Sequence, residues 1–197
     1  MKILARDAEL KALKLQMNPH FLFNTLNSIN ALITQNPGLA RKMISQLSEL
    51  LRASLESHDK LMISLKEELD LVHLYIAIER IRFGEKMQFE ERIDPELLTA
   101  PFPAMLLQPL LENAVKHGIA NSRRGGRIEL SIQKSNDYLL GTVSNEIDDR
   151  INRETSNGIS LKNIQQRLDR MYGDKYTWST SPNDSSYFTV SFKFPIG

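Results

Sequence analysis

The sequence predicts an α+β protein in which a helical hairpin precedes a unit of mixed helices and strands. Apolar residues recur at helical spacing through the early part of the chain,. Asn36-Pro37-Gly38 marks a turn between two such segments,. Alternation of apolar and polar residues, which is typical of strands, begins only at Met87,. We therefore expect two domains, residues 1–62 and residues 63–197.

Composition narrows the function classes. The chain has 197 residues, of which 41% are apolar and 25% charged, as expected for a soluble protein with a packed core,. A net charge of +1 without long blocks of one sign does not predict nucleic acid or an anionic membrane as a partner,. The absence of cysteine excludes disulfides, thiolate metal sites and a cysteine nucleophile,. We find no signal peptide, and no apolar run reaches the roughly 20 residues of a membrane helix.

Residues 1–35 are expected to form one long helix with a break near Pro19,. Its apolar stripe already includes residues near the start of the sequence, namely Leu4, Leu10, Leu13 and Met17. This pattern favours a helix that enters from upstream. The helix after the turn carries one apolar face formed by Met43, Leu47, Leu50 and Ser54, with Ile44, Leu51 and Leu55 beside it,.

The stretch 16–33 presents a histidine on its polar side. One side has the spacing of a buried seam and comprises Leu22, Leu26, Ile29 and Ile33,. The opposite side comprises His20, Asn24, Asn27 and Ala31. The imidazole is thus held on a rigid element and points away from the seam, which suits a nucleophile that an outside group must reach.

The hairpin is expected to form a homodimer. Each of its helices carries one apolar stripe, and a lone hairpin buries two stripes poorly. Pairing two hairpins into a four-helix bundle buries both. The less favoured alternative is that the hairpin packs only on the rest of its own chain.

The second domain is predicted to open with a capping box, in which Ser64 caps a helix and Glu67 reaches back,. That helix should end before Gly84. Further helices are expected at 104–117, closed by Gly118, and at 161–172. Strands are expected at 87–93, 127–134, 138–144, 177–180 and 187–194. This order predicts one sheet with helices on one face.

The expected helix 104–117 holds polar groups within an apolar segment, namely Glu112, Asn113, Lys116 and His117. Buried amides and imidazoles need partners. A ligand with phosphates and a divalent ion would supply them, because an amide oxygen can coordinate Mg²⁺ and lysine can meet phosphate. The alternative is that backbone groups near the helix end satisfy Asn113 and His117, and this helix alone favours that alternative.

The segment 145–160 is expected to be a loop longer than most connections, and such loops are often functional lids,. It ends in Asn157-Gly158 before the helix at 161–172. Backbone N–H groups at a helix N-terminus behind a glycine can bind an anion. A single glycine is a weak signal, since glycine is also common in plain loops.

Three motifs together make the sequence recognisable. Residues 15–27, LQMNPHFLFNTLN, closely resemble the phosphoacceptor box of the LytS-type sensor histidine kinases. Residues 107–118, LQPLLENAVKHG, resemble their ATP-binding N box. Residues 157–168, NGISLKNIQQRL, followed by Tyr172-Gly173, resemble the glycine motif that closes their ATP lid. The motifs occur in the family's order, and the resemblance covers roughly residue 10 to the end.

The resemblance implies a dimerisation and phosphotransfer hairpin followed by a GHKL-type α/β sandwich ATPase domain, with ATP and Mg²⁺ as cofactors. His20 would accept the γ-phosphoryl group, and an aspartate of a response regulator receiver domain would then take it. By similarity Asn113 would ligate Mg²⁺, and Lys116 and His117 would meet the phosphates. The lid and the phosphate side of the pocket would be lined by Gly158, Asn163 and Arg167.

The resemblance also implies a cytoplasmic location, as part of an inner-membrane sensor whose sensing region lies outside this chain.

Many histidine kinases place a carboxylate directly after the phosphoacceptor, but this chain has Phe21 there. Glu112 is therefore our candidate base, with a Glu112–Lys116 helical pair as a nearly equal alternative. Asn24, one turn after His20, is expected to orient the imidazole or to hold a water.

The chain also departs from the family at the adenine contact. GHKL ATPases usually carry Asp-x-Gly-x-Gly after a strand, whereas residues 142–149 here read TVSNEIDD. Asn145 is expected to bond the adenine amino group through its amide oxygen, with Asp148 and Asp149 as alternatives.

The leading prediction is a histidine autokinase, with regulator phosphatase activity as a possible second activity. One alternative is a catalytically weak, kinase-like dimeric scaffold. Another is a GHKL conformational ATPase without autophosphorylation, against which the phosphoacceptor box argues.

Glu79 and Arg82 are expected to form a helical ion pair, a role at the domain interface being the minority interpretation. Neither His58 nor His73 has neighbours at metal-ligand spacing,.

Overall fold

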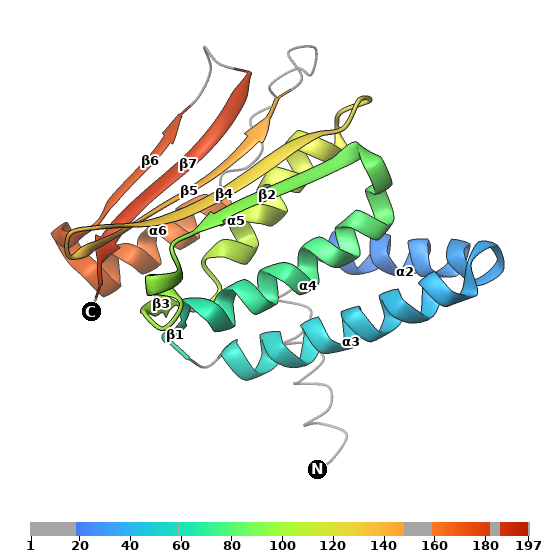
Figure 1. Ribbon diagram of the computed structural model, residues 1–197, viewed down its shortest axis with the longest axis horizontal. Coiled ribbons are helices and arrows are strands. Elements are labelled where there is room, and N and C mark those ends of the chain that lie inside the picture. Colours follow the sequence, from blue (N-terminus) through green and yellow to red (C-terminus); the bar gives the residue numbers. More distant parts are fainter. Residues whose placement is uncertain (1–18, 59, 148–158, 182–185, 197) are drawn as a thin grey trace.

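The helical hairpin is present and packs on the rest of the chain. The structure is a computed structural model that describes residues 19–58, 60–147, 159–181 and 186–196. Helices α2 (Pro19–Gln35) and α3 (Pro37–His58) form the hairpin, which lies beside α4 (Leu65–Phe83) (Figure 1). At the turn, the Leu39 N–H donates to the side-chain oxygen of Asn36 at 3.0 Å. Residues 1–18, for which an upstream helix was expected, lie outside the described part.

The buried side of α2 matches the predicted seam only in part. Phe21, Thr25 and Ile29 are buried, whereas Leu26 and Ile33 are each 53% exposed. The reason lies in α4, because the Phe21 ring packs on Tyr75 with ring centroids 5.1 Å apart. This contact turns one side of α2 toward α4 and leaves part of the predicted seam on the surface of the single chain.

Helix α4 begins and ends as predicted. The Ser64 N–H donates to the Glu67 carboxylate at 2.7 Å, and the Glu67 N–H donates to the Ser64 hydroxyl at 3.2 Å,. The N–H of Gly84, which has φ of 57°, donates to the Arg80 carbonyl and closes the helix,. The predicted apolar side is buried and comprises Leu65, Leu69, Val72 and Ile76.

One five-stranded sheet is covered on one face by helices (Figure 1). Its strand order is β2-β4-β5-β7-β6, and only the β2–β4 pair is parallel. The strands are β2 (Met87–Ile93), β4 (Gly126–Ser135), β5 (Tyr138–Glu146), β6 (Thr177–Ser181) and β7 (Tyr187–Pro195). The covering helices are α4, α5 (Leu107–Ala114) and α6 (Ile159–Tyr172). The α+β prediction, with helices on one face of the sheet, is confirmed.

The core lies between the sheet and the helices. Alternate residues of β4 and β7 are buried, as the alternation predicted: Ile128, Leu130, Ile132, Val190, Phe192 and Phe194. Phe194 of β7 stacks on Tyr172 of α6 with ring centroids 5.0 Å apart, so this contact fixes α6 to β7,. None of the helices in the described ranges has the length and the hydropathy to span a bilayer.

A short second sheet was not predicted. Strand β1 (Met62–Ser64) pairs antiparallel with β3 (Pro101–Pro103) and fastens the start of α4 to the segment before α5. Three residues are too few for alternation to be visible. The domain boundary after residue 62 falls within β1 and stays a prediction. Short helical turns complete the chain: η1 (Gly84–Lys86), η2 (Pro95–Leu97) and η4 (Gly173–Lys175).

The helix predicted over 104–117 is corrected at both ends. It begins at Leu107, and after Ala114 it continues as a wider π-helical turn, η3 (Val115–Ala120),. Gly118 therefore does not end it. A Cβ on Gly118 would lie 2.9 Å from the side-chain nitrogen of Asn145, so close packing against β5 explains this glycine,.

Glu68 of α4 holds the N-terminus of α5. It is fully buried, and its carboxylate accepts hydrogen bonds from the N–H of Met105 at 2.8 Å and of Leu107 at 2.7 Å. The bond to Leu107 satisfies an N–H group that a helix start leaves unpaired, the bond to Met105 fixes the segment just before the helix, and a negative charge there suits the helix dipole,. Burial raises the pKa of Glu68, and the hydrogen bonds oppose this rise.

We expect Glu68→Ala to lower the free energy of unfolding by about 3 kcal/mol or more, because a hydrogen bond to a charged group is worth roughly 1.5–3 kcal/mol and two are lost. Glu68→Gln keeps one acceptor oxygen and should lose about half as much. Urea unfolding followed by circular dichroism measures both. Asp70→Asn, which breaks an exposed pair with Lys66 on the same helix, is the matched control and should cost about 1 kcal/mol or less,. Equal stability of Glu68→Ala and the unsubstituted chain would contradict the capping role.

Candidate functional site

His20 stands in the first turn of α2 and is exposed, as predicted. The side-chain nitrogen of Asn24, one turn later, lies 3.2 Å from Nδ1 and 3.1 Å from Nε2 of the His20 ring. An amide held this close limits the orientations that the imidazole can take. The contact supports an orienting role for Asn24.

A small cavity of about 60 Å³ brings His20 together with Glu112. Three elements of the same chain meet there. Helix α2 contributes His20, Phe21 and Asn24. Helix α4 contributes Tyr75, Glu79, Arg82 and Phe83, and α5 with η3 contributes Glu112, Val115, Lys116 and Ala120. The candidate nucleophile and the candidate base therefore line one cavity, although they are far apart in the sequence.

Glu112 is half-buried on α5 and faces this cavity. The side-chain amide of Gln108, one turn earlier, donates to Glu112 Oε1 at 3.1 Å. This hydrogen bond fixes one carboxylate oxygen. Phe21 is 4% exposed and packs on Tyr75, so the side chain next to His20 serves the core rather than the chemistry.

The Glu79–Arg82 pair lies in the wall of the cavity. Nη1 of Arg82 is 2.5 Å from Oε1 of Glu79, which confirms the predicted helical ion pair. Burial raises the pKa of Glu79 to about 7; Arg82 acts to lower it and Glu112 acts to raise it. The position of this pair beside His20 was not predicted. The sequence contains one indication of it, because Glu79, four positions after Tyr75, is an acidic residue within the apolar stripe of α4.

Asn113 and His117, which both belong to the predicted N box, lie one helical turn apart on α5 and η3. Among the described residues, the Asn113 side chain has no hydrogen-bond partner, and it is half-buried. An amide oxygen without a protein donor fits a ligand of Mg²⁺. Burial lowers the pKa of His117, and the neighbouring charge of Lys116 lowers it further, which favours a neutral imidazole.

Asn145 lies at the end of β5, in contact with the N box. Its side chain is 1% exposed and donates to the carbonyl of Glu146 at 3.0 Å. The close approach of Gly118 brings these two motifs together. The structure thus places the candidate adenine contact beside η3, while the contact itself stays a prediction. The alternatives Asp148 and Asp149 lie outside the described residues.

The remaining predicted residues lie on α6 or before it. Arg167 donates to the carbonyl of Met105 at 3.2 Å, which links α6 to the segment before α5. Burial lowers the pKa of Arg167, and the charge of Glu68 opposes this. Asn163 is exposed on the same helix. Gly158 and the side chain of His58 lie outside the described residues.

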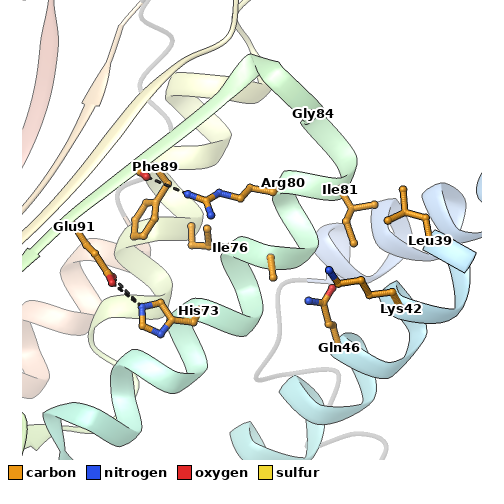
Figure 2. Close-up of a pocket in the computed structure, with 11 residues that line it drawn as sticks. Leu39, Lys42, Gln46, His73, Ile76, Arg80, Ile81, Gly84, Phe89 and Glu91 are labelled. Carbon is orange, nitrogen blue, oxygen red and sulfur yellow. Dashed lines mark hydrogen bonds and ion pairs between the residues drawn. The ribbon is translucent and has the colours of Figure 1, made fainter.

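A larger groove of about 700 Å³ lies between α3, α4 and β2, and Figure 2 shows it. Nε2 of His73 is 2.9 Å from the Glu91 carboxylate, and Arg80 donates to the Phe89 carbonyl at 3.1 Å. None of the predicted site residues lines this groove. Across the described ranges, we find no group of three His, Asp or Glu residues placed to hold a metal ion.

Comparison with known sequences agrees with the resemblance that the three motifs indicate. The profile of the histidine kinase family matches residues 8–87. The sensor histidine kinase YpdA of Escherichia coli is 37% identical over 183 residues, which cover 88% of this chain and 32% of YpdA. The sensor protein LytS of Staphylococcus haemolyticus is 35% identical over 184 residues, which cover 87% of this chain and 32% of LytS. This chain thus spans about a third of the length of these relatives.

Solved structures share the fold. The histidine kinase domain of a blue-light activated kinase from Erythrobacter litoralis has a TM-score of 0.52 at 16% identity, covering 96% of this chain and 94% of that domain. The catalytic domain of the histidine kinase ThkA has a TM-score of 0.54 at 15% identity, covering 68% of this chain and 96% of that domain. The sequence matches and the three motifs show that this chain belongs to the histidine kinase family, among sensor histidine kinases of the LytS type.

Proposed function

We propose that this chain is the kinase core of a two-component sensor, which phosphorylates itself on His20 with Mg-ATP and passes the phosphoryl group to an aspartate of a response regulator receiver domain. The observation that carries the proposal is the cavity that His20 shares with Glu112. An exposed nucleophile beside a carboxylate can be approached by a phosphoryl donor from outside while a base stands within reach. A conformational ATPase without autophosphorylation would have no use for this arrangement.

The proposed reaction is an in-line displacement. A nitrogen of His20 attacks the γ-phosphorus of ATP, an N–P bond forms, and the P–O bond to ADP breaks. Glu112 takes the proton that leaves the imidazole, since Phe21 occupies the place of a neighbouring carboxylate. Asn24 holds the ring while this happens. Positioning and charge neutralisation supply most of the catalysis in phosphoryl transfer.

The nucleotide is proposed to bind along α5, η3 and the end of β5. Asn113 would hold Mg²⁺, which neutralises phosphate charge, and Lys116 and His117 would meet the phosphates. Asn145 would meet adenine at the other end. Gly158, Asn163 and Arg167 would close the lid side. The amide of Asn113, which has no hydrogen-bond partner in the described part of the chain, and the contact of Asn145 with Gly118 support this order.

The proposed assembly is a homodimer through the hairpin. Large apolar side chains are exposed on both hairpin helices, each by 46–53%: Leu26, Ile33, Ile44 and Leu55. A second hairpin would cover them in a four-helix bundle. The cytoplasmic location and the link to a membrane sensor stay predictions.

His20→Gln should abolish the acid-labile ³²P that the chain incorporates from γ-labelled ATP, because the amide lacks a nucleophilic ring nitrogen. The label is measured after electrophoresis and acid treatment. His73→Gln is the matched control, since His73 is also exposed but lines the other groove. It should label at the rate of the unsubstituted chain. Acid-labile label in His20→Gln would contradict the assignment.

Asn113→Ala should weaken Mg-ATP binding by at least about tenfold, because losing even an outer-shell partner of a metal ligand usually costs about ten- to a hundredfold in metal affinity. The fold should persist, because the Asn113 side chain has no hydrogen-bond partner within the described residues. Calorimetry measures the affinity and circular dichroism the fold. Asn121→Ala, an exposed asparagine just past η3, should bind normally. Unchanged affinity in Asn113→Ala would count against the pocket.

The double variant Ile33→Glu/Ile44→Glu should be monomeric in light scattering at concentrations where the unsubstituted chain is dimeric, because the charges would be buried in the bundle. Ala31→Glu, an exposed site on the predicted polar side of α2, should leave the dimer intact. A dimer that survives both glutamates would refute this interface.

A further inference from the structure

The ion pair between Glu79 and Arg82 is almost entirely buried. The side chain of Glu79 is 1% exposed and that of Arg82 is 14% exposed. Burying two charges usually costs about as much as their attraction returns, so such a pair is weak evidence for a stabilising role. Oε2 of Glu79 is also buried without a hydrogen-bond partner among the described residues. Each such group requires an explanation.

Arg82 is held on two sides. Nη1 bonds to Glu79, and the guanidinium carbon lies 4.9 Å from the centroid of the Phe83 ring,. A guanidinium carries five N–H donors in one plane. Within the described residues, the bond that Nη1 donates to Glu79 is the only hydrogen bond that the Arg82 side chain makes. The fork is therefore fixed in orientation and keeps donors for a second anion.

Arg82 lines the same cavity as His20. Its volume of about 60 Å³ is far below the roughly 300 Å³ at which ligand pockets begin, so it admits a small group and not a nucleotide,. Its lining includes two cations, Arg82 and Lys116, and two carboxylates, Glu79 and Glu112. A phosphoryl group that arrives on His20 brings negative charge, and cations already in place stabilise that charge without reorganisation.

We propose that Arg82 is a catalytic residue that binds the phosphoryl group as it transfers to His20, and that Glu79 is a positioning residue that holds Arg82 for this contact. Lys116 supplies a mobile point charge, whereas Arg82 supplies a fixed, planar fork that matches phosphate oxygens. This inference rests on the proposed function, because it concerns the same reaction.

The double variant Glu79→Gln/Arg82→Gln tests the proposal. It replaces the pair by neutral side chains and leaves no unpaired buried charge. We expect it to fold, to bind Mg-ATP with unchanged affinity, and to label His20 about a hundredfold more slowly, the usual cost of losing one preorganised donor. Its KM for ATP should stay constant while kcat falls. Arg80→Gln, on the same helix but lining the other groove, should label at the unsubstituted rate.

Labelling of the double variant within twofold of the unsubstituted chain would overturn the role of Arg82 and leave the proposed function standing. No acid-labile label in the unsubstituted chain would overturn both. If the double variant loses its helical circular dichroism or its ATP affinity, Arg82→Lys decides, because it keeps the charge and the partner Glu79 but lacks the fork. A tenfold slower rate in Arg82→Lys supports the proposal, and a rate within twofold overturns it.

Discussion

The arrangement of the site depends on the buried carboxylate of Glu68. Its two hydrogen bonds fix the start of α5, and Arg167 of α6 reaches the Met105 carbonyl beside them. Three helices are therefore tied together at one point. Because α5 carries Glu112 and Asn113, the position of the candidate base and of the candidate metal ligand follows from this contact between α4 and α5.

Local features were predictable from the sequence because they are set by neighbouring residues. The capping box of Ser64 and Glu67, the end of α4 before Gly84 and the strands of the sheet follow from short-range patterns, and all are present. The exposure of His20 followed from helical periodicity. The family resemblance then indicated which polar residues to bring together, and the cavity does contain His20 and Glu112.

Features that depend on packing between elements were not predictable. Packing of Phe21 on Tyr75 of α4 decides which face of α2 is buried. Periodicity correctly gave Ile29, but it also gave Leu26 and Ile33, which are exposed in the single chain. Gly118 looked like a helix end, but its lack of a Cβ serves the approach of Asn145 from β5. In each case the deciding partner is distant in the sequence, so no local pattern records it.

Helix α4 emerges as the element that relates the two halves of the site. Glu68 and Glu79 are eleven residues apart, which is three helical turns and about 16 Å of rise, so both carboxylates point to the same side,. The first holds the start of α5, and the second lies at the cavity where α5 presents Glu112 and α2 presents His20. A rigid helix with a buried acid at each end fixes this spacing, which explains why charged residues interrupt its apolar stripe at these two positions.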